Sequence, residues 1–399
     1  MKPILTRFWQ ARWLTAARAQ KAWAYSAAFL IFLLALRSSV DFRAPLLTGA
    51  KPPSMDFVVF WSAGREVLAG NPAGAYQRAP MLALQANSVN ITKDQYYPFF
   101  YPPFLLPLCA ILAFPPYIMG LLAYALAQMA GFALVMRRLL PVNWPRSLLI
   151  LAPGMLVSAS VGQLGSLLAM LFATGIILIE QKPFWAGAAL AMLGIKPHLA
   201  LLPPLVLLAA RQWRALCGAI CAVAAAIALS AAWYGVPTWF GFIEAVQGAA
   251  RFQQDSIQVY PKMASVFTAV WFCGHHVGLA YAAQAVVAAI VFVSVIKLSY
   301  STGPRAGLVL ASVATPLISP HVFDYDLAVT LPGVAALALM AAGTGWRNGE
   351  KLACIAVFAI PVLARPLGIL LGVGAAPLCL ALLSALLYRR LGRQRAQNE

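Results

Sequence analysis

Residues 215–234 read ALCGAICAVAAAIALSAAWY, an unbroken apolar stretch in which no side chain carries a charge. An α-helix rises about 1.5 Å per residue, so a helix over this stretch is about 30 Å long and matches the hydrocarbon core of a bilayer. Arg211 and Arg214 lie just before the stretch, where a membrane helix meets water. The stretch therefore predicts a transmembrane helix.

Similar apolar runs recur along the chain. Of its 399 residues, 62% are hydrophobic and only 10% are charged, whereas a soluble domain has about 25% charged residues. We therefore predict an all-α polytopic membrane protein with about twelve transmembrane helices, within a range of about eleven to thirteen. The candidate spans cover residues 22–40, 116–136, 147–161, 164–180, 183–195, 199–210, 215–234, 277–298, 305–318, 325–342, 351–364 and 367–387.

Basic residues give the expected orientation. The formal net charge is +18, and the Lys and Arg residues lie in the gaps between apolar runs, not in a basic stripe. The positive-inside rule explains this excess, and we expect no nucleic-acid partner. With a cytoplasmic N-terminus, the cytoplasmic gaps receive Arg137, Arg138, Arg211 and Arg214, and the tail receives Arg389. We expect a multi-pass protein of the plasma (inner) membrane with both termini in the cytoplasm.

Two long loops are expected on the extracytoplasmic side, over residues 41–98 and 235–262. Residues 56–68 have apolar side chains at helical spacing and predict an interfacial helix on the membrane surface. Residues 99–114 are apolar enough to cross, but a crossing there would reverse the positive-inside pattern. We therefore predict an interfacial or re-entrant helix packed against protein. No domain boundary is visible, so residues 1–399 are treated as one transmembrane domain.

Polar residues gather where the predicted helices meet water on the extracytoplasmic side. Each group interrupts an apolar run, and together they contain acids, histidines and several cations. We therefore predict one polar site at this mouth of the bundle. The groups are Asp56; Gly162 and Gln163; Lys196 and His198; Arg251, Asp255 and Lys262; and Ser319, Pro320 and His321 with Asp324 and Asp326.

Each of these residues also has a structural alternative. Asp56 could cap the helix that follows it, and Lys196 could extend to the membrane interface. His198 and His321 could be interfacial hydrogen-bonding residues. Asp324 could complement a helix N-terminus or fix the tautomer of the His321 ring three residues before it.

Several kinds of site are excluded by their missing motifs. The chain contains no G-x-x-x-x-G-K-[ST] motif for nucleotide phosphates. It contains no H-E-x-x-H, C-x-x-C or D-x-D-x-D pattern, so we predict no metal site and no cofactor. Its six cysteines lie in apolar surroundings and are interpreted as packing residues.

Five short motifs, in this order, resemble glycosyltransferase family 87. These enzymes have the C-type glycosyltransferase fold, a bundle of membrane helices. This chain has Leu164 where family members often have Asn. The matching motifs are Met55 to Gly64 with Tyr76, Tyr101-Pro102-Pro103, Gly162-Gln163, Lys196-Pro197, and Ser319-Pro320-His321 with Tyr325 and Asp326.

The resemblance implies the substrates and the roles of the site residues. The donor is expected to be a polyprenyl-phosphate-linked hexose, with mannose as the first candidate, and the acceptor a glycolipid or glycan hydroxyl. Asp56 is expected to be the catalytic base of an inverting transfer. The residues expected to bind substrate or its phosphate are His321, Lys196, His198, Gln163, Arg251, Tyr101 and Asp326.

Three other functions fit a multi-spanning protein. A transporter or lipid flippase would place its charges near the bilayer midplane, whereas the acids here lie at the helix ends. An oligosaccharide polymerase or ligase would use a diphosphate-linked donor. An inactive relative that acts as a scaffold would not need Asp56 and His321.

Overall fold

The computed structural model describes residues 50–52, 55–91, 95–140, 151–254 and 257–398, with isolated residues between 10 and 28. The candidate span 22–40 therefore lies almost entirely outside the described residues. The described part of the chain is helical and contains no strand; an isolated antiparallel bridge joins Met263 and Phe323. The predicted all-α class is confirmed for these residues.

The α-helices range in length from 7 residues in α14 to 26 residues in α15. The α-helices are α3 (Phe57–Leu68), α4 (Arg78–Ser88), α5 (Leu106–Ala113), α6 (Tyr117–Leu139), α8 (Pro153–Val161), α9 (Gly165–Leu178), α10 (Pro183–Ala191), α11 (Leu202–Ala209), α12 (Trp213–Tyr234), α13 (Val236–Gln254), α14 (Val266–Phe272), α15 (Val277–Thr302), α16 (Pro304–Ala314), α17 (Leu331–Thr344), α18 (Glu350–Leu371) and α19 (Ala376–Asn398). The 3₁₀ helices are η1 (Pro72–Tyr76), η2 (Pro103–Leu105), η3 (Met192–Ile195), η4 (Pro197–Leu199), η5 (Ile257–Lys262), η6 (Thr315–Leu317) and η7 (Asp324–Thr330).

Five helices among the described residues are long and apolar enough to cross a membrane. They are Tyr117–Leu139, Trp213–Tyr234, Val277–Thr302, Asp324–Thr344 and Glu350–Leu371. The candidate spans 164–180, 183–195 and 199–210 correspond to shorter apolar helices. The protein is thus a helical membrane protein, while the count of twelve spans stays a prediction.

The boundary predicted between spans 351–364 and 367–387 is wrong. α18 continues from Glu350 to Leu371 through Pro361 and Pro366, and α19 begins only at Ala376. Proline is tolerated inside membrane helices because neighbouring groups satisfy the backbone carbonyls that it leaves unpaired. Arg365, which the sequence places in a gap between spans, therefore lies inside a helix.

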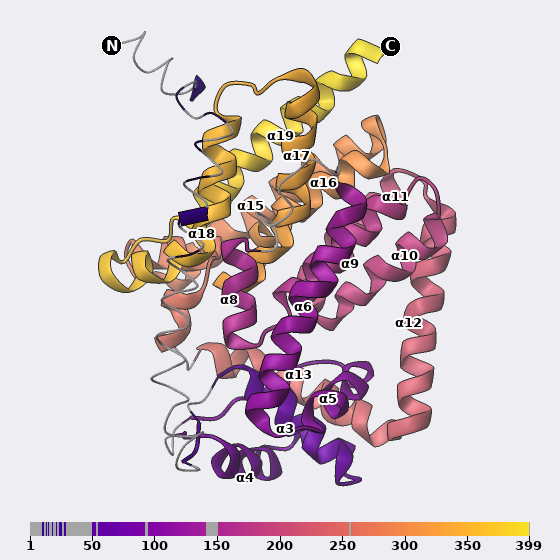
Figure 1. The fold of residues 1–399 in the computed structure, drawn as a ribbon, viewed down its shortest axis with the longest axis vertical. Helices are drawn as coiled ribbons and strands as arrows, with labels where there is room; N and C mark the ends of the chain where they lie inside the picture. The colour runs from indigo at the N-terminus through magenta and orange to yellow at the C-terminus, as the bar shows by residue number, and fades with distance from the viewer. Residues whose placement is uncertain are drawn as a thin grey trace.

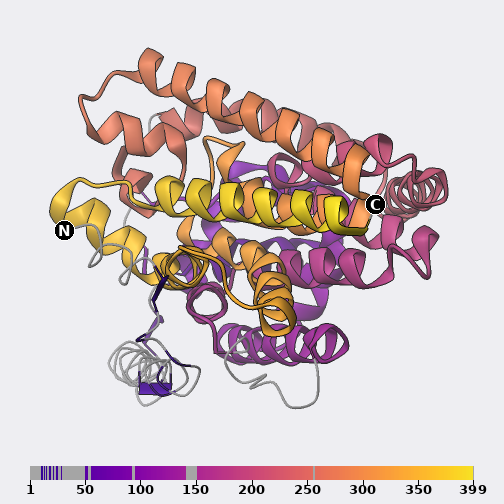
Figure 2. The same ribbon diagram turned by 90° about the horizontal axis from the view of Figure 1, so that it is seen from above.

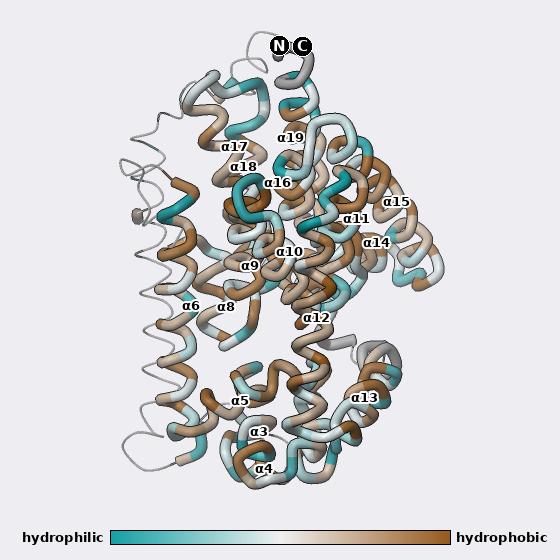
Figure 3. The backbone as a smooth tube through the Cα atoms, turned by 90° about the vertical axis from the view of Figure 1, so that its right-hand side faces the viewer, coloured by the Kyte–Doolittle hydropathy of each residue, from teal (hydrophilic) through white to brown (hydrophobic). Residues whose placement is uncertain are grey.

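The helices divide into a main bundle and a cluster at one end of it. Figure 1 shows α3, α4, α5 and α13 together at the lower end of the molecule, while α19 ends at the opposite end. Figure 2 shows α19 (yellow) running beside α15 (orange) across the bundle. In Figure 3, apolar colours cover most of the length of α12 and α15, as expected of lipid-facing helices.

The end of the bundle away from this cluster is held by ion pairs. Arg390 of α19 is buried and donates to Glu350 at the start of α18 and to Thr344 at the end of α17. Arg305 at the start of α16 reaches Glu180, just after α9, at 3.1 Å. Arg305 of α16 and Arg390 of α19 therefore each form an ion pair at this end.

Helix α3 is held by protein contacts on most of its surface. Its buried residues include Phe57, Phe60 and Glu66. It packs closely against α5, where a Cβ atom at Gly64 would lie 2.0 Å from the carbonyl oxygen of Cys109. The segment 99–114 contains η2, which packs against α12, and α5, which packs against α3. The predicted packing of this segment against protein is confirmed, and its position in a membrane stays a prediction.

Candidate active site

Asp56 lies immediately before α3 but does not cap it. Its side chain makes no capping hydrogen bond to the helix, so the capping alternative is wrong. Instead, Oδ2 of Asp56 accepts a hydrogen bond of 3.1 Å from Nε2 of Gln163, which is far away in the sequence. The structure thus joins the first loop to the turn between α8 and α9.

The turn that presents Gln163 requires a glycine. Gly162 ends α8 with φ 70°, in the left-handed region, and a Cβ atom there would lie 2.5 Å from Cβ of Phe57. Gln163 then donates its backbone N–H to the carbonyl of Ser158 at 2.9 Å, and Ser158 Oγ donates to the carbonyl of Gln163 at 3.1 Å. These bonds fix the direction of the Gln163 side chain.

Tyr101 sets the orientation of the Gln163 amide. Its hydroxyl donates to Oε1 of Gln163 at 3.2 Å, which leaves Nε2 to donate to Asp56. The backbone of Tyr101 is held in turn, because its carbonyl accepts the Tyr76 hydroxyl at 2.8 Å. Burial, with the charges of Asp326 and Asp56, holds the pKa of Tyr101 well above its usual value, so the hydroxyl stays protonated. Tyr101, Gln163 and Asp56 therefore form one hydrogen-bonded row.

Tyr101→Phe should lower activity about tenfold, because it leaves a buried amide oxygen unpaired and frees the Gln163 amide to rotate. The matched control is Tyr124→Phe, since the buried Tyr124 hydroxyl has no hydrogen-bond partner among the described residues. The two variants are compared by their initial rates of sugar transfer at saturating substrate. Equal rates for the two variants would contradict the proposed role of Tyr101.

Lys196 pairs with Asp326 inside the protein. The distance between Nζ and Oδ1 is 2.6 Å, and the side chains are 6% and 0% exposed, so the alternative in which Lys196 extends to the interface is wrong. The ammonium also lies over the Tyr325 ring, 4.7 Å from its centroid. Oδ2 of Asp326 accepts the backbone N–H of Phe323 at 3.2 Å, which ties the pair to the start of η7.

A second ion pair lies on the same turn of η7. Oδ2 of Asp324 is 2.9 Å from both Nε and Nη2 of Arg365, and Oδ1 accepts the N–H of Tyr325 at 2.9 Å. No hydrogen bond joins Asp324 to His321 among the described residues, so the alternative in which Asp324 fixes the tautomer of His321 gains no support. Sequence reasoning missed Arg365; the signal available was one cation between two apolar runs.

The two histidines lie near each other and near Lys196, close enough to interact electrostatically. Nε2 of His198 and Nδ1 of His321 are buried and have no hydrogen-bond partner among the described residues. Burial lowers the pKa of His321, so the ring is neutral at neutral pH. The hydrogen bond from Ala264 N–H to the carbonyl of Val322, 2.7 Å long, holds the segment that carries His321.

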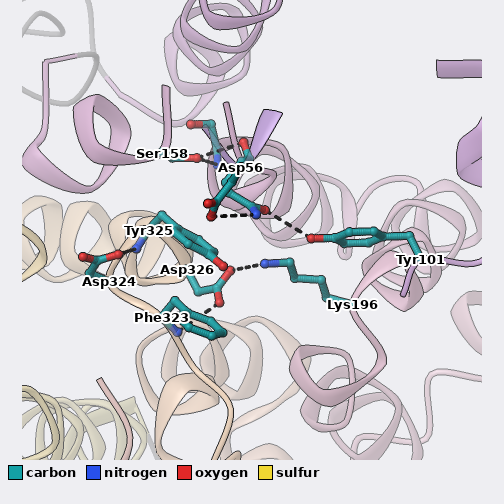
Figure 4. A network of polar contacts seen from close by, with 10 residues as sticks. Asp56, Tyr101, Ser158, Lys196, Phe323, Asp324, Tyr325 and Asp326 are labelled. Carbon is teal, nitrogen blue, oxygen red and sulfur yellow. Dashed lines mark hydrogen bonds and ion pairs between the residues drawn. The ribbon is translucent and has the colours of Figure 1, made fainter. Parts of the chain in front are cut away.

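The packing of η7 on α8 and α9 brings these groups together. A Cβ atom at Gly165, the first residue of α9, would lie 2.0 Å from the carbonyl oxygen of Tyr325. In Figure 4 the Asp56 carboxylate lies above the Lys196–Asp326 pair, with the Tyr325 ring beside both. Asp56, Gln163, Tyr101, Lys196 and Asp326 therefore share one site.

Gly165→Ala should destabilise the protein by about 1–3 kcal/mol, because the added methyl group would displace the backbone of Tyr325. Gly194→Ala is the control, since no atom lies within 4 Å of a Cβ atom built there. Thermal unfolding in detergent checks both. Equal midpoints for the two variants would mean that η7 does not pack as described.

The side chains of two predicted site residues lie outside the described structure. Arg251 belongs to α13, but its side chain lies outside the part of the structure that is described, as does Asp255. Lys262 ends η5, next to the bridge between Met263 and Phe323. The predicted role of Arg251 stays a prediction.

The charges of the site leave one carboxylate unneutralised. Asp326 and Asp324 have the cations Lys196 and Arg365 as partners. Within the described residues, Asp56 has no ion pair, and its bond from Gln163 comes from a neutral amide. A carboxylate in this position can accept a proton, which is what a general base requires.

The fold and the site define a helical membrane protein in which the carboxylate of Asp56 lies near the buried Lys196 and two imidazoles. The chain belongs to glycosyltransferase family 87, whose family model matches residues 99–320. Membership of this family indicates glycosyltransferase activity. The match includes Tyr101, Gln163, Lys196 and His198, ends one residue before His321, and does not reach back to Asp56. The chain matches no curated protein and no solved structure.

Proposed function

We propose that the protein transfers a hexose, with mannose as the first candidate, from a polyprenyl-phosphate carrier to a hydroxyl of a glycolipid or glycan. The observation that supports this proposal most strongly is the environment of the Asp56 carboxylate. It is the carboxylate of the described site that has no cation partner, and Gln163 and Tyr101 hold it in position. Family membership supports the reaction class.

The reaction needs one base. The Asp56 carboxylate takes the proton of the acceptor hydroxyl while the hydroxyl oxygen attacks the anomeric carbon of the donor. The bond from that carbon to the phosphate oxygen breaks, and the polyprenyl phosphate leaves with the electron pair. A single displacement of this kind inverts the anomeric centre.

The leaving phosphate needs positive or hydrogen-bonding groups around it. The unpartnered imidazole nitrogens of His198 and His321 supply hydrogen-bonding positions beside Lys196. Their neutral rings can bind the phosphate without the cost of keeping two buried charges close together. Arg251 is a further proposed contact.

We propose that the site faces the extracytoplasmic side of the plasma membrane. This is supported by the separation of the site cluster from the bundle end where Arg305 and Arg390 form ion pairs. The positive-inside rule favours a cytoplasmic location for the basic end, and for the chain termini. In this arrangement the chain is one domain of about twelve spans.

A donor panel tests this function. Purified protein in lipid is supplied with an acceptor and either polyprenyl-phosphate hexoses, polyprenyl-phosphate pentoses or nucleotide sugars, and products are identified by mass. We expect transfer from a polyprenyl-phosphate hexose and none from a nucleotide sugar. Transfer from nucleotide sugars alone would refute the proposal.

A further inference from the structure

Arg365 is a charged residue inside an apolar helix. α18 is one of the helices long and apolar enough to cross a membrane, and Arg365 lies in it between Pro361 and Pro366. An ionised side chain in such a helix is costly and generally serves a pathway or a site. The ion pair with Asp324 uses only some of the N–H groups of this side chain.

The ion pair uses one edge of the guanidinium group. Nε and Nη2 both contact the same oxygen, Oδ2 of Asp324, at 2.9 Å. Asp324 is 2% exposed, whereas the Arg365 side chain is 30% exposed. An arginine has about five N–H donors, and Nη1 of Arg365 has no partner among the described residues. The second edge of the group therefore remains available.

Arg365 pairs with a residue of the turn that also carries Asp326, the partner of Lys196. Asp324 and Asp326 flank Tyr325 in a single turn, and their cations come from distant segments: Arg365 from α18 and Lys196 from the link between η3 and η4. The charge of Asp56 acts on Asp324 as well as on Tyr101, so the three groups share one electrostatic environment. Arg365 is thus one residue, Asp324, removed from the turn that pairs with Lys196.

We propose that the unused edge of Arg365 binds a phosphate group of a substrate. This inference rests on the proposed function, because it assigns a further contact within the same site. Two parallel N–H groups of a guanidinium match two phosphate oxygens, which a lysine ammonium cannot reproduce. If the side chain at position 365 served only to neutralise Asp324, a lysine would be enough. The phosphate can belong to the donor carrier or to an anionic acceptor.

Direct binding separates these two sources. Farnesyl phosphate stands for the donor carrier, and an octyl hexoside that carries a phosphate group stands for an anionic acceptor. Dissociation constants for both probes are measured by calorimetry in detergent for the wild type, Arg365→Lys and Arg365→Gln. Arg305→Gln is the control, because its ion pair with Glu180 is exposed, at 52% and 57%, and distant from the site.

We expect Arg365→Lys to weaken binding of one probe about tenfold or more, while Arg305→Gln binds both as the wild type does. The probe that is weakened identifies the source of the phosphate. Arg365→Lys keeps a charge beside Asp324, so it decides the question even if Arg365→Gln does not fold. Wild-type affinity of Arg365→Lys for both probes, or no binding of either probe by the wild type, would overturn the inference.

Binding does not require turnover. A wild type that binds a probe through Arg365 but transfers no sugar from any polyprenyl-phosphate donor would therefore refute the proposed function and leave the role of Arg365 standing. The two proposals can fail separately.

Discussion

Asp56→Asn should reduce the rate of sugar transfer by about 10²–10⁴-fold, the usual contribution of a general base. Asparagine has nearly the same shape as aspartate, and its carbonyl oxygen can still accept the hydrogen bond from Nε2 of Gln163. We therefore expect the variant to fold and to bind its substrates. The loss should appear in kcat, with little change in KM.

Glu66→Gln is the matched control for this experiment. Glu66 lies in α3, the helix that follows Asp56; it is buried and accepts a hydrogen bond of 2.7 Å from Nδ2 of Asn71, away from the site network. Rates of both variants are compared in lipid after equal yields of folded protein are established by gel filtration. A rate for Asp56→Asn close to that of the wild type would remove Asp56 from the mechanism.

Lys196→Met should destabilise the protein by about 3–5 kcal/mol, because it leaves the carboxylate of Asp326 charged and buried without its cation. Adding Asp326→Asn should recover most of this loss. The asparagine is neutral and can still accept the N–H of Phe323. Activity should not return with stability, because the cation beside the histidines is still missing. Thermal unfolding and transfer assays on the single and double variants check both parts.

The exposed pair between Arg305 and Glu180 provides the comparison for this ion pair. Arg305→Gln should change stability by only about 0–1 kcal/mol, since water screens an exposed pair. If Lys196→Met is no more destabilising than Arg305→Gln, the ion pair between Lys196 and Asp326 is not formed in the protein as described.

The sequence predicted the helices well because membrane helices must be apolar over their whole length. The predicted spans 116–136 and 215–234 correspond to α6 and α12. The ends were predicted less well where Arg365 and Pro366 separate two apolar runs. α18 continues through Pro361 and Pro366, which no rule based on local sequence would indicate.

The sequence predicted that several polar residues would lie together, but not which of them would form bonds with one another. Polar residues at helix ends on one face indicated that Asp56, Gln163 and Lys196 would be neighbours, and the structure places them in one site. Which group pairs with which depends on packing between distant segments, as in the contact of Gly165 with Tyr325. For that reason Asp326, expected to bind substrate, is found as the partner of Lys196.

Arg365 is a second residue whose partner the sequence does not indicate. A single cation between two apolar runs is typical of a loop that follows the positive-inside rule. Only the continuity of α18 and its packing against η7 bring the guanidinium to Asp324. The partner of an ionised residue inside a membrane helix is a property of the fold, not of the neighbouring sequence.

The stereochemistry of the transferred sugar tests the central claim most directly. A single carboxylate base at Asp56 implies one displacement at the anomeric carbon, with no covalent sugar on the enzyme. Wild-type protein is supplied with a polyprenyl-phosphate hexose of known anomeric configuration, and the configuration of the new glycosidic bond is determined by NMR. We expect the inverted configuration; a product that retains the configuration of the donor would contradict the mechanism.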